Sequence, residues 1–368
     1  MQNINNKIIL ELTNNKYRSV FFLVIIFYLL SIFYEFKEFH LWQQVEYLHS
    51  LNFRIRLSNL YSYPHSMRYL LVTPIYYMSD LLNVDYNFIF SILVVVFCTV
   101  VSFLFYGIIS NIVWVKDKWL LMSVIMIYFS LLTLSMNGRL VFGFLSYSLF
   151  FYGYVGIILN KRNLLSILYV ISSLFFSSAT SGIAISLFLI SSVLMAIWFF
   201  WINRISKLKI MTVMFFLIFF ILYSPIILML VNKNLNYFGS SITESVVSMT
   251  SHGVIAANVD KLNKNSINKN SINKNSINKN SINKNSINKE LINKLLWSFF
   301  SIFLFYYIFK FKGIFFKNII LLLIVLFMIF ILLLSIFANS ILMMGFVPFI
   351  LMVMIVYYGK GRVKKIDI

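Results

Sequence analysis

The sequence predicts an all-α protein, a polytopic integral membrane bundle of about ten transmembrane helices. Hydrophobic residues make up 61% of the 368 residues and charged residues only 11%, a balance far from that of soluble proteins. Apolar runs of about 18 or more residues, long enough to cross the hydrocarbon core, alternate with short polar gaps. Lys and Arg fall mainly in every second gap, which is typical of cytoplasmic loops.

Each apolar run is assigned as a span, and only the longest run is divided. The predicted spans are 19–36, 88–114, 119–136, 140–160, 164–180, 182–203, 210–231, 295–309, 318–338 and 341–358. The run 164–202 is divided at its Ser- and Gly-containing break, because one helix of that length would measure about 60 Å, roughly twice the hydrocarbon thickness. The first run lacks a small-residue cleavage site, so we expect a retained span there.

Positive charge predicts the orientation. With the N-terminus in the cytoplasm, seventeen Lys and Arg fall on the cytoplasmic side and five on the other side. The seventeen are Lys7, Lys16, Arg18, Lys116, Lys118, Lys161, Arg162, Arg204, Lys207, Lys209, Lys310, Lys312, Lys317, Lys360, Arg362, Lys364 and Lys365; the five are Lys37, Arg54, Arg56, Arg68 and Arg139. The loop 232–294 is left out because long loops translocate largely regardless of charge. We therefore expect a multi-pass protein of the bacterial inner membrane with both termini in the cytoplasm.

The predicted organisation is a membrane domain at 1–231 with a periplasmic loop at 37–86, an extracytoplasmic loop at 232–294, and a second membrane segment at 295–368 with three helices and a cytoplasmic tail. In the first loop, Leu41, Trp42, Val45 and Leu48 have roughly helical spacing, which indicates an amphipathic helix. The apolar stretch 69–82 is too short for a normal span and suits a re-entrant or interfacial segment.

The second loop ends in tandem copies of Ser-Ile-Asn-Lys-Asn, with Lys at every fifth position from Lys264 to Lys294. A period of five matches neither a helix nor a strand, so the Ile residues form no apolar stripe. Low-complexity Asn, Lys and Ser cannot bury enough apolar surface to offset the entropy of ordering. We expect a disordered insert, with binding of an acidic glycan as the functional alternative.

Composition argues against several chemistries. Cys98 is the only cysteine, so no disulfide can form within the chain, and the four His residues all lie in the two outer loops. No soluble-enzyme motif is present, and neither a metal nor a cofactor is expected. The formal charge of +20 is attributed to topology and to contact with membrane lipids rather than to nucleic acid. Few ionisable residues lie within the spans, which disfavours an ion-coupled transporter.

Arginines on the outer side oppose the topology rule and are candidate anion ligands. Arg54, Arg56, Arg68 and Arg139 each carry a planar fork that donates paired hydrogen bonds to phosphate or carboxylate. A solvated face is the alternative for Arg54 and Arg56. Arg139 lies in a very short turn between two spans, where a side chain that snorkels to the interface is the alternative.

Two outer residues are candidates for a general base. Glu46 follows the first span, and His65 lies close to Arg68 in the sequence. A carboxylate or an imidazole at this position can accept a proton from a sugar hydroxyl. Ordinary solvation at the interface is the alternative for Glu46.

With this layout, the chain resembles Wzy-type O-antigen and capsule polymerases and EpsG-like exopolysaccharide proteins. The resemblance lies in the ten spans, the cytoplasmic termini, the segment 63–68 with His65 and Arg68, and the segment 137–139 (Asn-Gly-Arg). The Arg-x10-Gly pattern of some members is absent, since Phe150 stands at that spacing after Arg139. The resemblance implies a glycosyltransferase-type enzyme of O-antigen, lipopolysaccharide, capsule or exopolysaccharide biosynthesis.

The implied reaction joins undecaprenyl-diphosphate-linked repeat units at the periplasmic face, with the arginines on the diphosphate and Glu46 or His65 as the catalytic base. A chain-length regulator protein is a further candidate partner. Two other functions remain open: a lipid-phosphate-dependent membrane glycosyltransferase, and a flippase or transporter of lipid-linked glycan. The first would usually need an acidic pair for a metal, and the second needs a continuous polar route through the membrane.

Deletion of four repeat copies within 264–289 is expected to leave protein level and glycan assembly nearly unchanged, because the tract cannot form part of a core. Immunoblotting and a gel of the cell's glycan measure the two quantities. Lost activity at normal expression would show that the tract has a role.

Overall fold

The computed structural model describes residues 2–34, 38–53, 56–63, 65–135, 138–158, 163–179 and 207–238, short helical pieces between 183 and 192, and Ile302 and Tyr306. The chain forms two compact units, one of Met1–Met229 with Ile350–Ile368 and one of Leu230–Phe349. Almost all described residues belong to the first unit. Every regular element among the described residues is helical, as the sequence predicts.

Six described helices coincide with predicted spans. They are α1 (Gln2–Phe33), α5 (Tyr86–Ile112), α6 (Lys118–Ser135), α7 (Val141–Ile158), α8 (Asn163–Ser177) and α10 (Lys207–Phe238). Helix α1 also includes the polar residues before the apolar run, and α10 continues into the predicted loop. The predicted span 182–203 is described only in part, and the rest of the insertion 232–294 and the last three predicted spans lie outside the described residues, apart from Ile302 and Tyr306.

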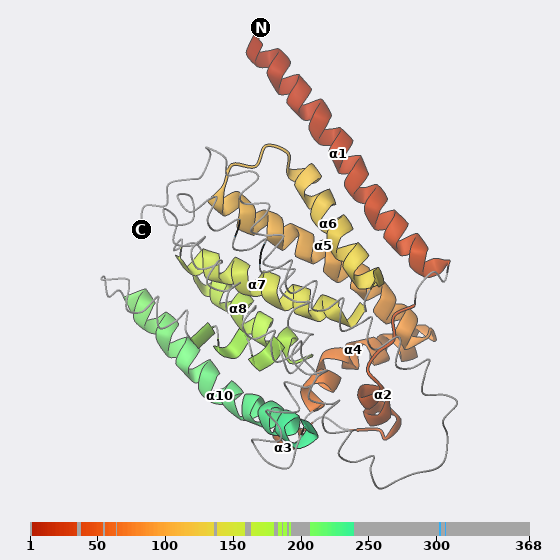
Figure 1. The fold of residues 1–368 in the computed structure, drawn as a ribbon, viewed down its shortest axis with the longest axis vertical. Coiled ribbons are helices and arrows are strands. Elements are labelled where there is room, and N and C mark those ends of the chain that lie inside the picture. Colours follow the sequence, from red (N-terminus) through yellow and green to blue (C-terminus); the bar gives the residue numbers. More distant parts are fainter. Residues whose placement is uncertain are drawn as a thin grey trace. The chain divides into compact units, whose positions relative to one another are not determined.

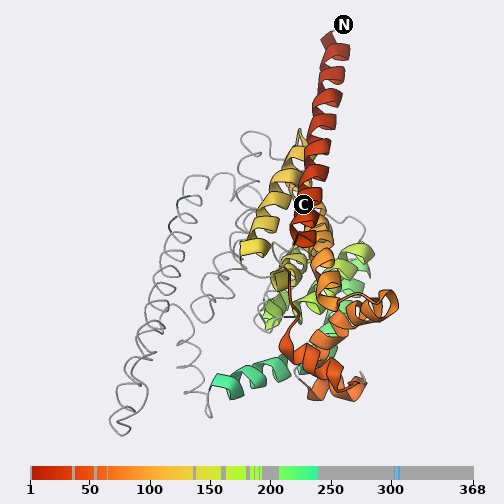
Figure 2. The same cartoon turned by 90° about the vertical axis from the view of Figure 1, so that its right-hand side faces the viewer.

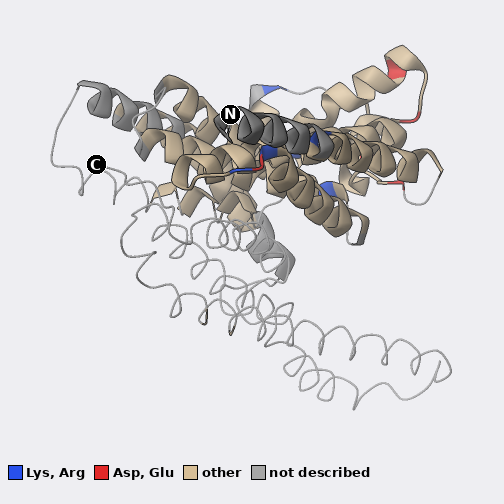
Figure 3. Cartoon of the chain, turned by 90° about the horizontal axis from the view of Figure 1, so that it is seen from above, with Lys and Arg blue, Asp and Glu red and all other residues tan. Residues whose placement is uncertain are grey.

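Two stretches, Tyr86–Ile112 and Gly138–Ile157, are long and apolar enough to cross a membrane. Shorter apolar helices occupy Tyr17–Phe33, Lys118–Leu134, Leu164–Ser177 and Phe220–Asn232. Figure 3 shows how few charged residues these helices carry. Together these features give weak support to the prediction of a membrane protein.

Helix α5 lies at the centre of the first unit and packs against α1, α4, α6 and α7, while α7 also packs along α8 (Figure 1). Two glycines permit these close contacts. A Cβ on Gly107 would lie 2.5 Å from the ring of Tyr152, and one on Gly153 would lie 2.6 Å from the carbonyl oxygen of Ser166. Small residues allow such close approach between apolar helices, where dispersion contacts dominate.

Two buried tyrosine hydroxyls bond from one helix of the bundle to another. The hydroxyls of Tyr28 in α1 and Thr133 in α6 form a hydrogen bond. The hydroxyl of Tyr223 in α10 donates to the carbonyl oxygen of Leu174 in α8 at 2.8 Å. Each pairing removes the cost of an unsatisfied buried hydroxyl and ties two helices together.

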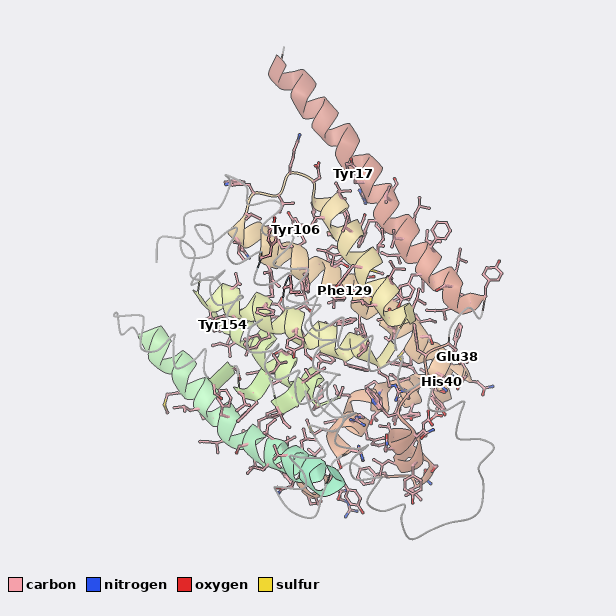
Figure 4. The ribbon with its side chains drawn as sticks, in the orientation of Figure 1. Tyr17, Glu38, His40, Tyr106, Phe129 and Tyr154 are labelled. Atoms are coloured by element: carbon pink, nitrogen blue, oxygen red, sulfur yellow. The ribbon has the colours of Figure 1, made fainter. Side chains whose placement is uncertain are left out.

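Three short helices gather at one end of the first unit: α2 (Gln43–Ser50), α3 (Leu57–Ser62) and α4 (Ser66–Leu82). Figure 2 shows them at the end opposite to the N-terminus of α1. At this α2–α4 end, α1 and α6 finish and α5 and α7 begin. The labelled side chains of Glu38 and His40 lie here in Figure 4, and those of Tyr17 and Tyr106 lie toward the other end.

The expected helix around 41–52 is confirmed as α2, with Val45 and Leu48 buried. The stretch 69–82 is the greater part of α4, which contains Pro74 and ends at Asn83 in the left-handed conformation (φ 52°, ψ 44°). A left-handed residue is a common helix terminus, because it turns the chain and satisfies a free carbonyl. Here the amide of Val84 bonds back to the carbonyl of Ser79 at 3.2 Å.

Candidate anion-binding site

The extended segment 38–42 is held against the N-terminus of α5. The backbone amide of Phe39 donates to Oγ of Ser91 at 3.0 Å, and the amide of Leu41 donates to Oδ1 of Asn87 at 3.0 Å. Asp85 caps α5 and accepts from the amide of Asn87 at 3.4 Å. Because a buried unpaired amide is costly, these bonds fix where the segment lies.

A short helix, η1 (Gly138–Leu140), meets this segment from the turn between α6 and α7. A Cβ on Gly138 would lie 2.5 Å from Cγ of Phe39 and 2.9 Å from its Cβ. Only glycine therefore lets the turn approach Phe39 this closely. The contact sets the position of Arg139, the next residue.

Trp42 connects this segment to the core and to two arginines. Its ring is 7% exposed and lies 5.6 Å from the ring of Phe142 in α7. The guanidinium carbon of Arg68 lies 4.9 Å from the centre of the Trp42 ring, and that of Arg139 lies 5.8 Å from it. One indole thus contacts two cations by cation–π attraction. We call Arg68 and Arg139 the arginine pair.

Arg68 is partly buried near the start of α4 and is held in place. Its Nε donates to the carbonyl oxygen of Ala179 at 2.8 Å. Burial, and to a lesser extent the charge of Arg139, lowers the pKa of Arg68 to about 10. The side chain is therefore still charged at neutral pH. A bound anion would favour the charged form and raise this pKa again, so the arginine pair is suited to an anion.

Glu46 extends the site on the α2 side. Its carboxylate is partly exposed and interacts electrostatically with Arg139. It also contributes, after burial and Tyr86, to the raised pKa of Tyr76 in α4. Glu46 therefore lies within electrostatic range of Arg139 and of the hydroxyls of Tyr76 in α4 and Tyr86 in α5.

Aromatic contacts hold α2, and hence Glu46, on α4. The ring of His49 stacks on that of Tyr76 with centres 3.8 Å apart and an angle of 8°. Nδ1 of His49 and the hydroxyl of Tyr69 form a hydrogen bond of 3.1 Å. Tyr69 and Tyr76 are themselves buried. The carboxylate of Glu46 thus stands on a helix that is fixed to the element carrying Arg68.

The structure brings two of the predicted site residues, Arg68 and Arg139, onto one tryptophan, and it places Glu46 within electrostatic range of Arg139. His65 is the partly buried N-terminal cap of α4. Arg56 is exposed at the N-terminal cap of α3, and no described contact joins it to Trp42. Arg54 lies outside the described residues.

Sequence reasoning missed the role of Trp42. Its helical spacing with Val45 and Leu48 indicated only an apolar face of α2. A tryptophan at a predicted membrane boundary, in a loop rich in arginine, was the available signal. In the described part of the chain, no three His, Cys, Asp or Glu side chains come close enough to hold a metal ion.

Comparisons with known protein families, with curated proteins and with solved structures found no match to this chain.

Replacement of Gly138 by Ala is expected to push Phe39 away and to displace the arginine pair through the shared segment. We expect a loss of about 1–3 kcal/mol in the free energy of unfolding, as for other overpacked sites. Thermal unfolding of the purified protein measures it. The same substitution in a Phe39→Leu background should cost less, because the smaller side chain can move aside; an equal cost in both backgrounds would contradict the contact.

Proposed function

We propose that this protein is a polysaccharide polymerase of the bacterial inner membrane, which joins lipid-diphosphate-linked oligosaccharide repeat units at the periplasmic face. The observation that carries the proposal is the convergence of Arg68 and Arg139 on Trp42, with Glu46 within electrostatic range of Arg139. A diphosphate has several oxygens that can accept from two guanidinium forks. Its carbohydrate supplies a hydroxyl that needs a base.

In the proposed reaction, a hydroxyl oxygen of the acceptor repeat unit attacks the anomeric carbon of the donor glycan. The bond from that carbon to the diphosphate oxygen breaks, and its electron pair leaves with undecaprenyl diphosphate. The acceptor proton passes to the carboxylate of Glu46, with His65 as the other candidate base. The arginine pair binds the diphosphate and stabilises the charge that develops on it.

The surroundings of the arginine pair support a role in stabilising this leaving group. Arg68 is partly buried and hydrogen-bonded to a backbone carbonyl, so its guanidinium is already oriented before a ligand arrives. Donors held in advance need no reorganisation as charge develops, and they act more strongly where water is scarce. The alternative function, a lipid-phosphate-dependent glycosyltransferase, would bind its donor diphosphate at the same arginine pair. Its product would differ, because it would add one sugar rather than build a ladder of repeat units.

The proposal places the α2–α4 end on the periplasmic side, in a chain of ten spans. Reporter fusions after Asp367 and between residues 234 and 260 are expected to report the cytoplasm and the periplasm respectively, because the charge bias favours that orientation. Enzymatic reporters active in only one compartment measure this. The reverse pattern would place the arginine pair in the cytoplasm and overturn the proposed site of reaction.

Loss of the arginine pair is expected to abolish polymerisation. A strain without the gene should carry glycan of one repeat unit and lack the long-chain ladder. In complementation, Arg68→Ala and Arg139→Ala should each reduce polymer by about tenfold or more, since a charge-assisted hydrogen bond contributes about 1.5–3 kcal/mol. Arg139→Lys should retain part of the activity, because lysine keeps the charge and loses the fork.

The exposed Arg56 provides the matched control, since Arg56→Ala removes the same charge from the loop that also carries Arg68. It should restore a full ladder. Chain length on a gel, with protein level measured in parallel, reports each variant. A full ladder from both alanine variants of the arginine pair would refute the anion-binding role, and a deletion strain with a normal ladder would refute the polymerase function itself.

A further inference from the structure

A second pair of cations meets on a tryptophan at the other end of the first unit. The guanidinium carbon of Arg18 in α1 lies 5.7 Å from the centre of the Trp119 ring, and Nζ of Lys118 in α6 lies 5.1 Å from it. Lys118 also lies 5.2 Å from the ring of Tyr106 in α5. Three helices therefore contribute to one cationic and aromatic group, which we call the Trp119 cluster: Arg18, Tyr106, Lys118 and Trp119.

The Trp119 cluster is open to its surroundings. Arg18 is exposed, and Tyr106, Lys118 and Trp119 are partly exposed. Trp114, in the turn that leads to α6, is 65% exposed. Exposed tryptophan and tyrosine beside Lys and Arg are typical of the headgroup level of a membrane, where an amphipathic ring has both an apolar and a polar environment.

An exposed apolar row continues from the cluster along α1. Phe22, Ile26 and Phe33 are 47%, 49% and 57% exposed and share the face of the helix that carries Arg18. At the rise of an α-helix, the row from Phe22 to Phe33 is about 16 Å long. Half of the hydrocarbon core of a bilayer is about 15 Å.

A second row has the same character on α5. Val96, Val100 and Phe103 are 46%, 38% and 44% exposed and follow helical spacing along one face. Phe103 joins this row to the cluster, because Nζ of Lys118 lies 6.0 Å from its ring. Both rows therefore begin at the cations and run toward the α2–α4 end.

We propose that the Trp119 cluster binds the phosphate of an anionic diacyl phospholipid, whose acyl chains lie along the exposed rows of α1 and α5. The two cations complement the phosphate, and the apolar rows match the length of one leaflet. Arg18, Lys116 and Lys118 all fall on the predicted cytoplasmic side, where anionic lipids attract basic residues near the end of a span. This site depends on a membrane location and not on the polymerase proposal.

The test is the thermal midpoint of the full-length protein in detergent micelles as phosphatidylglycerol or phosphatidylcholine is added. The wild type should be stabilised by phosphatidylglycerol more than by phosphatidylcholine. The double variant Arg18→Ala/Lys118→Ala should bind phosphatidylglycerol about tenfold more weakly, since each surface cation contributes separately to the attraction. The double variant Arg18→Lys/Lys118→Arg keeps both charges and should keep the response, which separates binding from folding.

Lys161→Ala/Arg162→Ala is the matched control, because it removes two positive charges from another loop on the same predicted side. It should respond as the wild type does. An equal response to both lipids in the wild type, or an unchanged response in Arg18→Ala/Lys118→Ala, would overturn the proposal. Equal stabilisation by inorganic phosphate at the same ionic strength would also overturn it, because the apolar rows of α1 and α5 would then contribute nothing to binding.

Discussion

The candidate site depends on how the backbone amides of the segment 38–42 are hydrogen-bonded. The segment forms no helix, so these amides need partners from outside it. Asn87 and Ser91, in the first turns of α5, accept from the amides of Leu41 and Phe39. The segment is therefore fixed to the central helix of the bundle. Phe39 can then lie against Gly138, and Trp42 can lie between the start of α4 and the turn before α7. Hydrogen bonding of two amides thus decides where two distant arginines meet.

The arginine pair is a high-energy arrangement that needs compensation. Arg68 is partly buried near a like charge, and its lowered pKa reflects both effects. The carbonyl of Ala179, the face of Trp42 and the carboxylate of Glu46 near Arg139 offset part of the cost. An anion with several oxygens would offset more. The electrostatics therefore favour an anionic ligand.

Two tryptophans hold paired cations at opposite ends of the same bundle, yet their surroundings differ. Trp42 is buried, and its arginines are constrained by a backbone carbonyl and by a glycine contact. Around Trp119, Arg18 is exposed and lies beside apolar rows that face outward. The first environment suits a specific ligand held in one orientation, and the second suits a lipid at an interface. Burial separates the two roles, although the residue types are nearly the same.

The sequence by itself determined the helical class and the positions of α2 and of the six described helices that match predicted spans, because apolar runs and their polar breaks are local features of the chain. It also indicated Arg68, Arg139 and Glu46 as candidates, because charge placement is readable without a fold. Only the tertiary structure decided that Arg68 and Arg139 share one tryptophan, that Arg56 is exposed apart from them, and that Gly138 is needed for the approach of Phe39. These facts depend on contacts between residues far apart in the chain, and no local periodicity encodes such contacts.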